Sequence, residues 1–232
     1  MFHHRRRSEL DGQDIGWLKA RYHFIVRPTG QPAHAPLGPL IVWNDDEIAA
    51  GTGFGMHGHR DLEIISYIRE GAVSHRDDAG GRGRMVAGDV QVISAGRGIR
   101  HEEFNREATP LKLFQIWIES NQLGAEPRWQ SKPFPREHRA GQLVTLASGI
   151  PGDDDALPIR ANARVMAVTL EAGEVVRHRL APGAQAYLVP ATGALRVNGE
   201  DLGAGDGLAM TDEPELVLTA TADAEVVLVE LL

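Results

Sequence analysis

The sequence of 232 residues contains no cysteine, and aromatic residues make up only 6% of it. The lack of cysteine excludes disulfides, thiolate metal ligands and a cysteine nucleophile, and it suits a reducing compartment. Long apolar runs are also missing, so no segment is predicted to cross a bilayer. The basic cluster HHRRR near the start is not followed by an apolar stretch. We therefore expect no signal peptide and a cytoplasmic location.

An excess of positive charge is lacking as well. Lys and Arg number 24 against 32 Asp and Glu, which gives a formal net charge of -8. Nucleic acids and anionic membrane surfaces favour basic faces, so neither is expected as a direct partner. Apolar residues account for 42% of the chain, which is enough for a packed core. The composition indicates a globular protein, which we expect to be a monomer.

Amphipathic helical patterns are scarce, whereas short β-rich runs recur between turn residues. Clear examples are LIVWN, EIISYI, DVQVISAG and LKLFQIWIES. In the last of these runs Leu111, Leu113, Gln115 and Trp117 alternate with their neighbours and should share one face of a strand. This pattern predicts an all-β fold of the sandwich or barrel type.

The character of the sequence changes from about Asn121 to Gln142, a stretch with three prolines and little periodicity. Such a stretch is typical of a linker or a long loop. We predict two β domains in tandem: an N-terminal domain over residues 1–122, a linker over 123–142 and a C-terminal domain over 143–232. A faint internal repeat agrees with two domains. The first half contains REGAVSHRD followed by AGDVQVISAG, and the second half contains the similar stretches VPATGALRVNG and GAGDGLAMTD.

Two short stretches contain the histidines that are candidate metal ligands. GTGFGMHGHRDLE carries His57 and His59 two residues apart in a strand-compatible run. Both imidazoles would face one side of a strand, although such a pair also occurs as surface or structural histidines. SAGRGIRHEEFN supplies His101 and Glu103 with the same spacing. On neighbouring antiparallel strands the two pairs would offer three imidazoles and one carboxylate, a set that suits iron, manganese, cobalt, nickel or copper.

Two other carboxylates compete with Glu103. Glu63 has the parity of His59 but would lie roughly 13 Å further along an unbroken strand. A bend at RDLE could bring it back toward an ion; otherwise it is a buried acid that supports the site or the fold. Glu102 has the wrong parity relative to His101, so Glu103 is the predicted ligand.

The remaining histidines are expected to lie outside this site. His75 follows a hairpin-like glycine and is predicted to cap a strand, and His178 lacks a companion histidine. We therefore predict a second domain without a metal. The isolated histidines expected in solvent or packing roles are His3, His4, His23, His34 and His138.

At these residues the chain resembles the cupin superfamily. The first cupin motif is matched by Gly51, His57, His59, Glu63 and Gly71. The second is matched by Gly88, Ser94, Gly96, His101 and Asn105. A serine stands where the second motif usually has proline, and the gap before its histidine is longer than usual.

Those departures are typical of one branch of the superfamily. The stretches GFGMHGHRDLEIISYIREGAVSHRD, SAGRGIRHEEFN and LFQIWI closely resemble the pirin family. The resemblance implies a bicupin of two tandem jelly-roll β-barrels. It further implies one divalent transition metal in the N-terminal cupin, with iron(II) expected first and nickel, cobalt, copper, manganese or zinc as alternatives. The ligands implied are His57, His59, His101 and Glu103.

Some bacterial pirin-like proteins of this length are quercetin 2,3-dioxygenases. The resemblance therefore implies a metal-dependent dioxygenase that opens a flavonol, or a similar anionic small molecule, with O2 and releases carbon monoxide. Four protein ligands leave open positions on a six-coordinate ion, and the net positive charge of the centre favours an anion. Glu103 is then a ligand and a candidate catalytic proton acceptor. The alternative is a non-enzymatic iron-binding pirin, a redox-sensitive partner of transcription factors or metabolic enzymes.

Overall fold

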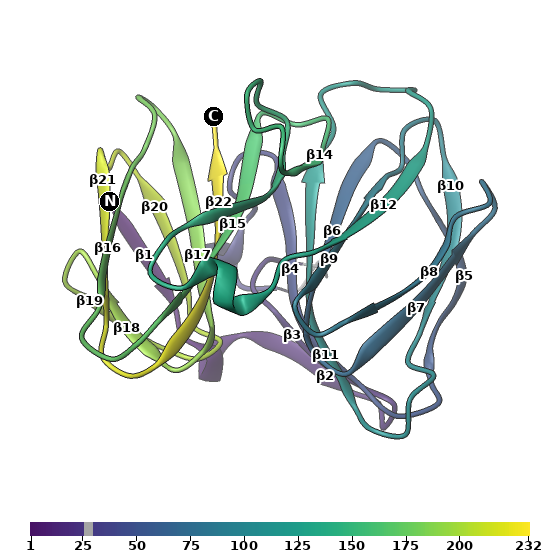
Figure 1. Cartoon of the computed structure of the whole chain (residues 1–232), viewed down its shortest axis with the longest axis horizontal. Coiled ribbons are helices and arrows are strands. Elements are labelled where there is room, and N and C mark those ends of the chain that lie inside the picture. The colour runs from purple at the N-terminus through teal and green to yellow at the C-terminus, as the bar shows by residue number, and fades with distance from the viewer. Residues whose placement is uncertain (26–29) are drawn as a thin grey trace. The chain divides into compact units, whose positions relative to one another are not determined.

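The computed structural model describes residues 1–25 and 30–232, and nearly all of their regular structure is β-strand (Figure 1). The chain divides into two compact units. The N-terminal unit comprises Asp11–Phe134 and Leu157–Ala161. The C-terminal unit comprises Met1–Leu10, Pro135–Ala156 and Asn162–Leu232. Each unit contains a large and a small antiparallel sheet, which confirms the predicted all-β bicupin fold.

The N-terminal unit consists of strands around an apolar core. Its strands are β2 (Asp11–Asp14), β3 (Leu18–Tyr22), β4 (Leu40–Ile48), β5 (Gly53–His59), β6 (Leu62–Glu70), β7 (Ala72–Asp77), β8 (Arg82–Val86), β9 (Asp89–Ser94), β10 (Ile99–Phe104), β11 (Leu111–Glu119), β12 (Arg128–Pro133) and β14 (Leu157–Pro158), with the 3-10 helix η2 (Pro32–His34) before β4. The large sheet has the order β12-β9-β6-β11-β4-β3-β2, and the small sheet has the order β5-β10-β7-β8. One core cluster takes residues from both sheets, so the two sheets form opposite walls of one barrel.

The C-terminal unit repeats this plan. Its elements are β1 (Phe2–Arg5), η1 (Arg7–Glu9), η3 (Arg136–Arg139), β13 (Val144–Ser148), β15 (Ala163–Leu170), β16 (Val175–Arg179), β17 (Gln185–Thr192), β18 (Ala194–Val197), β19 (Glu200–Gly203), β20 (Gly207–Thr211), β21 (Glu215–Ala220) and β22 (Ala224–Leu231). One sheet runs β1-β20-β17-β22-β15-β13, and the other runs β16-β21-β18-β19. Its buried core is almost entirely aliphatic. Within the described part of the chain, no helix is long and apolar enough to cross a membrane.

The units differ from the predicted domain ranges: residues 1–10 lie in the C-terminal unit, the predicted linker is divided between the two units, and residues 157–161 lie in the N-terminal unit. Strand β1 pairs with β20, so the first ten residues belong to the C-terminal unit. Residues 128–133, within the predicted linker, form β12, which pairs with β9. Both strands lie at the edge of their sheets. Edge strands are short and polar, and they show weak alternation, which is why the sequence pattern missed them.

The inner faces of β4 and β11 form one wall of a cavity in the N-terminal unit. Leu111 and Leu113 belong to the apolar core cluster, while Gln115 and Trp117 line a cavity. The predicted shared face of these four residues is therefore confirmed. In the ladder Gln115 lies opposite Asn44 of β4. The inner face of the large sheet thus changes from apolar to polar along its length.

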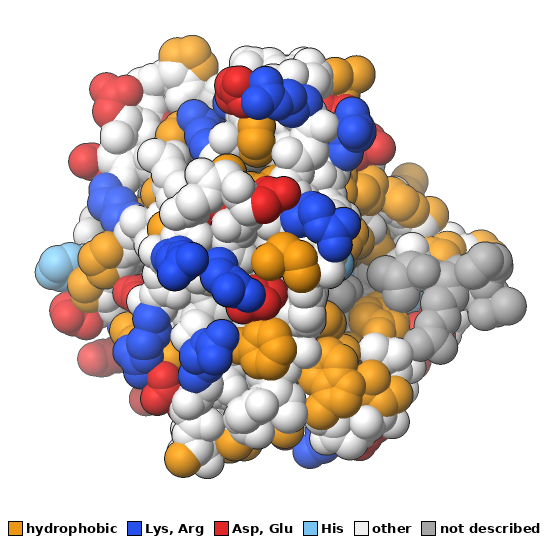
Figure 2. Space-filling model, turned by 90° about the vertical axis from the view of Figure 1, so that its right-hand side faces the viewer, with side chains coloured by type: hydrophobic (Ala, Val, Ile, Leu, Met, Phe, Trp, Pro, Cys, Tyr) orange, Lys and Arg blue, Asp and Glu red, His pale blue; other side chains and the backbone are white. Residues whose placement is uncertain are grey.

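The outer face of the small sheet is charged. Arg76 of β7 pairs with Glu102 of β10 at 2.9 Å, and Arg84 of β8 pairs with Glu107 at 2.8 Å. Figure 2 shows basic and acidic side chains mixed over the side of the molecule on which this sheet lies. Solvent-exposed pairs of this kind add little to stability. The alternate residues of β7 and β10 face inward, where the candidate site lies.

Candidate metal centre

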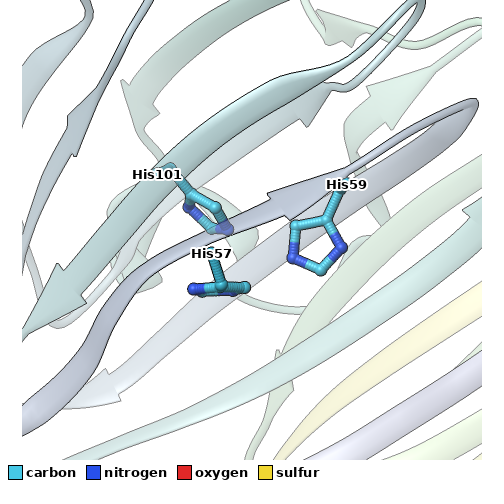
Figure 3. Close-up of side chains that lie close together, drawn as sticks. All are labelled: His57, His59 and His101. Atoms are coloured by element: carbon cyan, nitrogen blue, oxygen red, sulfur yellow. The ribbon is translucent and has the colours of Figure 1, made fainter.

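Three imidazoles meet where β5 and β10 pair. The strands are antiparallel neighbours, as the sequence predicted, and His101 lies opposite His57. The ring centroids are 4.4 Å apart for His57 and His101, 4.8 Å for His57 and His59, and 5.1 Å for His59 and His101. Figure 3 shows the three rings beside one another, two from β5 and one from β10. One nitrogen from each ring lies within 4.8 Å of the others, as in a set that can share one ion.

The backbone next to the histidines is shaped by a glycine. The β5–β10 register shifts after His101, because Glu103 lies opposite Phe54. At Gly53 a Cβ atom would come within 2.2 Å of the carbonyl oxygen of Glu103. Only glycine permits so close an approach between the two backbones. Glu103 lies two residues after His101 on β10 and, like His101, is buried.

The ring nitrogens suit metal ligation. His101 is 1% exposed, and neither of its ring nitrogens has a hydrogen-bond partner among the described residues. A buried polar atom without a partner costs about 1–3 kcal/mol, and a metal would remove that cost. The Nδ1 atom of His57 lies 2.8 Å from the carbonyl oxygen of Gly55 and donates to it. The Nε2 atom of His57 is then the one available to an ion, as is usual for a ligating histidine.

Burial keeps two of the imidazoles neutral. Desolvation, followed by the neighbouring His57 and His75, lowers the pKa of His101 to about 3. Desolvation, followed by His101 and His57, lowers the pKa of His59 to about 4. Only a neutral imidazole can bind a cation. At neutral pH these histidines are therefore in their ligating form.

Glu103 is held by two parallel hydrogen-bond chains, the Trp–Gln relays. Gln91 Nε2 donates to Oε1 of Glu103, and Gln115 Nε2 donates to Oε2 at 2.8 Å. Trp129 Nε1 donates to Gln91 Oε1 at 2.9 Å, and Trp117 Nε1 donates to Gln115 Oε1 at 3.1 Å. An indole N–H can only donate, so it fixes the carbonyl end of its glutamine and directs the amide N–H toward Glu103. Oε1 also accepts from the Ser66 hydroxyl at 3.5 Å, whereas Gln115 is the donor to Oε2 among the described residues, so Oε2 keeps a lone pair for a cation.

The donor set fits a divalent transition metal. A Glu103 oxygen lies within 4.8 Å of ligand atoms of His101 and His75. Glu103 also lines the same cavity as His57 and His59. Three imidazoles and one carboxylate are ligands that iron, nickel, cobalt, copper or zinc accept. The structure thus places all four sequence-predicted ligands around one region of the barrel, with the three histidines most closely grouped.

His75 lies beside this cluster, so its predicted role as a strand cap is wrong. It is 3% exposed, its Nε2 atom lies 2.8 Å from Oδ2 of Asp77, and its ring centroid is 5.5 Å from that of His101. Trp129 stacks on it at 4.9 Å with an interplanar angle of 3°. Gly83 makes room for the indole, because a Cβ there would lie 2.4 Å from the ring. The pairing of β7 with β10 brings His75 inward, and nothing in the spacing of the histidines indicated that pairing.

The other candidates from the sequence lie elsewhere. Glu63 is fully buried and accepts a hydrogen bond from the Ser94 hydroxyl at 2.5 Å, and burial raises its pKa. It belongs to neither metal-like cluster found among the described residues. Glu102 faces outward to Arg76. In the C-terminal unit, His178 Nε2 lies 3.2 Å from Oε2 of Glu230 and also belongs to neither cluster of the described chain.

A cavity of about 250 Å³ adjoins the cluster. His57, His59 and Glu103 form one part of its lining. Leu18, Phe54 and Trp117 add apolar surface, and Asn44, Asp46 and Gln115 add polar groups. Ligand pockets commonly start at about 300 Å³ and combine apolar walls with a few polar groups. At about 250 Å³ the cavity is slightly smaller than that range, and its mixed apolar and polar lining is that of a small-molecule site.

Asp46 is a buried carboxylic acid in the lining of this cavity, and its pKa is raised. It is 2% exposed, and burial, followed by the charges of Asp45 and Glu103, raises its pKa to about 8, with Arg69 opposing the shift. A carboxyl group with a pKa near 8 keeps its proton at pH 7. The cavity therefore contains a neutral acid on the large sheet and the neutral imidazole of His59 on the small sheet.

The titration of Asp46 should appear in the pH dependence of stability. Between about pH 4 and pH 8 the folded protein holds a proton on Asp46 that the unfolded chain has lost, so rising pH favours unfolding. Relative to Asp46→Asn, the metal-free wild type should lose at most about 1.4 kcal/mol of unfolding free energy per pH unit across this window. Urea unfolding of both proteins at pH 5.0 and pH 7.5 measures the difference. A difference in unfolding free energy between the two proteins that stays constant with pH would contradict the raised pKa of Asp46. Glu47→Gln provides a control on the same strand.

Two family models match the chain. The one described as pirin matches residues 3–118, and the one described as the quercetinase C-terminal cupin domain matches residues 145–231. A pirin-like protein of Caulobacter vibrioides is 52% identical over 223 residues, 96% of this chain and 96% of its own. A quercetin 2,3-dioxygenase of Escherichia coli is 34% identical over 232 residues, 100% of this chain and 99% of its own.

The fold is also similar to solved structures. The bacterial pirin YhhW from Escherichia coli, in complex with nickel(II), superposes with a TM-score of 0.93 at 32% identity. The superposition covers 100% of this chain and 99% of that chain. The similarity therefore extends over both units, including the strands that bear the three histidines and Glu103.

Proposed function

The chain belongs to the pirin family of the cupin superfamily, and from this premise we propose that it is a metal-dependent dioxygenase acting on flavonols. His57, His59, His101 and Glu103 would hold one divalent metal in the N-terminal unit. The observation that carries the proposal is the buried His101, whose nitrogens lack partners among the described residues, beside two further imidazoles at the edge of a cavity. Iron(II) is the first candidate, and nickel(II) is supported by its presence in the Escherichia coli pirin.

The protein groups around the cavity suit an anionic aromatic substrate. When bound, the metal would supply a positive centre for an ionised hydroxyl and redox chemistry toward O2. Phe54 and Trp117 offer ring surfaces on which a flat molecule can pack. The apolar walls exclude water and so strengthen the attraction between the substrate anion and the positive centre. The cavity thereby orients the substrate with its ionised oxygen toward the three histidines.

Glu103 is better suited to ligation than to proton transfer. Both of its oxygens accept an N–H from a glutamine amide. An oxygen that already accepts hydrogen bonds has less lone-pair capacity left to take up a proton. We infer that Glu103 supplies charge to the centre, and that the flavonol proton leaves by way of solvent at the cavity mouth.

Oxygen uptake with excess quercetin tests the proposal. The protein is freed of metal with a chelator and reloaded separately with iron(II), nickel(II), cobalt(II) or manganese(II). Many molecules of O2 consumed per metal ion would support catalysis. Uptake limited to one equivalent, or none with any of these metals, would favour the non-enzymatic pirin role, in which the ion alters a surface used for binding another protein.

The Trp–Gln relays give a separate prediction. Trp117→Phe keeps an aromatic ring but removes the N–H that fixes Gln115, so the amide can turn its oxygen toward Glu103. Loss of such a supporting contact typically weakens metal affinity by about 10–100-fold. Competition with a chelator of known affinity measures the change. Trp17→Phe makes the same substitution outside both relays and should leave the affinity unchanged; equal affinities in the two variants would show that the relay does not orient Glu103.

A further inference from the structure

The wall of the cavity provided by the large sheet carries two polar residues that the proposed metal centre does not use. Asn44 and Asp46 lie two residues apart on β4, so they share a face of the strand. Both line the cavity together with His57 and His59 of the small sheet. The cavity thus has candidate ligands on one sheet and a polar pair on the other.

The polar pair lacks partners within the described part of the chain. Oδ1 of Asn44 and Oδ1 of Asp46 are buried, and no described residue donates a hydrogen bond to either atom. Asp45, the residue between them, instead pairs with Arg69. A buried acceptor without a donor costs about 1–3 kcal/mol. Both Oδ1 atoms are closed to solvent, so a bound molecule would meet the pair through the parts of the two side chains that line the cavity.

The nearest amide on the neighbouring strand cannot provide those donors. Gln115 lies opposite Asn44 in the β4–β11 ladder. Its amide nitrogen donates to Glu103, and its oxygen accepts from Trp117. The relay that orients Glu103 therefore leaves Asn44 and Asp46 open toward the cavity.

We propose that Asn44 and Asp46 form a subsite that binds the hydroxyl groups of a polyhydroxylated aromatic substrate. The proposal rests on the proposed function and specifies its substrate class. A phenolic hydroxyl would form hydrogen bonds with the polar atoms that Asn44 and Asp46 present to the cavity, while Leu18, Phe54 and Trp117 pack against the ring system. A volume of about 250 Å³ favours a free aglycone over a sugar conjugate.

The electrostatics of the subsite agree with this ligand class. Burial first, and then the charges of Asp45 and Glu103, raise the pKa of Asp46. A protonated carboxyl does not repel a substrate that carries its negative charge at the metal end. It can also donate its own proton to a substrate oxygen, so the pair can both donate to a phenolic group and accept from it. A site built to hydrogen-bond a hydroxyl strongly disfavours the analogue that lacks it, because its own polar groups stay unpaired.

The test compares the binding of two flavonols that differ only in hydroxyl groups. Quercetin has two hydroxyls on its pendant ring, and galangin has none there. Dissociation constants are measured without oxygen, by quenching of tryptophan fluorescence, on the metal-loaded protein. Wild type should bind quercetin at least tenfold more tightly than galangin, a ratio that corresponds to about one recovered hydrogen bond. Asp46→Leu should reduce the ratio to about twofold, and Asp46→Asn, which keeps an uncharged hydrogen-bonding group, should retain most of it.

Two further variants keep the test decisive. Asn44→Ala removes the second acceptor with little change in packing and should also lower the ratio, which covers a failure of Asp46→Leu to fold. Glu47→Gln lies on the same strand, where Glu47 pairs with Lys19 at 3.0 Å outside the cavity, and should leave the ratio unchanged. A preference for quercetin that survives in both Asp46→Leu and Asn44→Ala would overturn the subsite, as would equal binding of both flavonols by wild type.

Oxygen consumption by the same samples separates this inference from the proposed function. A preference that depends on Asp46, without catalytic oxygen uptake, would support the subsite and refute the dioxygenase. Catalytic oxygen uptake, together with a preference for quercetin that does not depend on Asp46 or Asn44, would refute the subsite and support the dioxygenase.

Discussion

His101→Ala is expected to abolish stoichiometric metal binding, lowering the metal content from one ion per chain to below about one tenth. His101 is the residue shared by both metal-like clusters, and its ring nitrogens are buried without partners among the residues that the structure describes. Removing it leaves two imidazoles and a carboxylate, and each lost ligand lowers affinity steeply. Elemental analysis of the purified variant, after incubation with excess metal and gel filtration, measures the content.

The matched control for this variant lies in the C-terminal unit. His178 contacts Glu230 at 3.2 Å in a network that also includes Arg164, so His178→Ala removes a partly buried imidazole and its contact. This variant should keep one metal ion per chain. A full metal content in His101→Ala, or its loss in His178→Ala, would show that the ligands are assigned wrongly. Metal should also raise the melting temperature of wild type but not that of His101→Ala, because only the folded site binds it.

Glu103→Gln should reduce turnover at least 100-fold and metal affinity about 10–100-fold. The substitution removes the negative charge of the centre. It also places an amide N–H₂ group against one of the two relay glutamines, whose own N–H is directed at the same position. Because Trp117 and Trp129 fix those glutamines, neither can turn to accept from the new amide. The loss of affinity should therefore exceed that expected from charge alone.

A double variant distinguishes the relay effect from the charge effect. Adding Trp117→Phe to Glu103→Gln frees Gln115 to turn its oxygen toward the new amide, which should partly restore metal affinity while turnover stays low. Chelator competition gives the affinity, and oxygen uptake gives the turnover. Unchanged turnover in Glu103→Gln would exclude Glu103 from the centre, and a double variant that binds metal more weakly than Glu103→Gln would contradict the relay.

The parts of the site that depend on spacing within a strand could be predicted from the sequence. His57 with His59, and His101 with Glu103, share faces because side chains alternate along a strand, and the glycines that precede them mark the turns. The cupin motifs then indicated that the two strands are neighbours. The separation of the chain into two β-barrels followed from the change in composition from about Asn121 onward and from the repeat of hairpins.

The parts that depend on which strands become neighbours could not be predicted in this way. Gln91 and Gln115 each lie 12 residues from Glu103 in the sequence, on strands β9 and β11 of the opposite sheet. Asp46 is part of the run NDDE, which looks like an exposed polar turn, yet β4 is buried between β3 and β11. The pairing of β1 with β20 joins opposite ends of the chain. Each of these contacts depends on the packing of the whole barrel and therefore cannot be predicted from the local sequence pattern.

The amount of carbon monoxide released per O2 consumed, measured on metal-loaded protein with excess quercetin, tests the central claim most directly. Ring opening by a flavonol dioxygenase releases one molecule of carbon monoxide for each O2 consumed, whereas simple oxidation of the flavonol by a free metal consumes O2 without that product. We predict a ratio close to one, sustained over many turnovers and absent in His101→Ala. Oxygen uptake without carbon monoxide, or no uptake with any flavonol, would contradict the assignment of this pirin as a quercetinase-type enzyme.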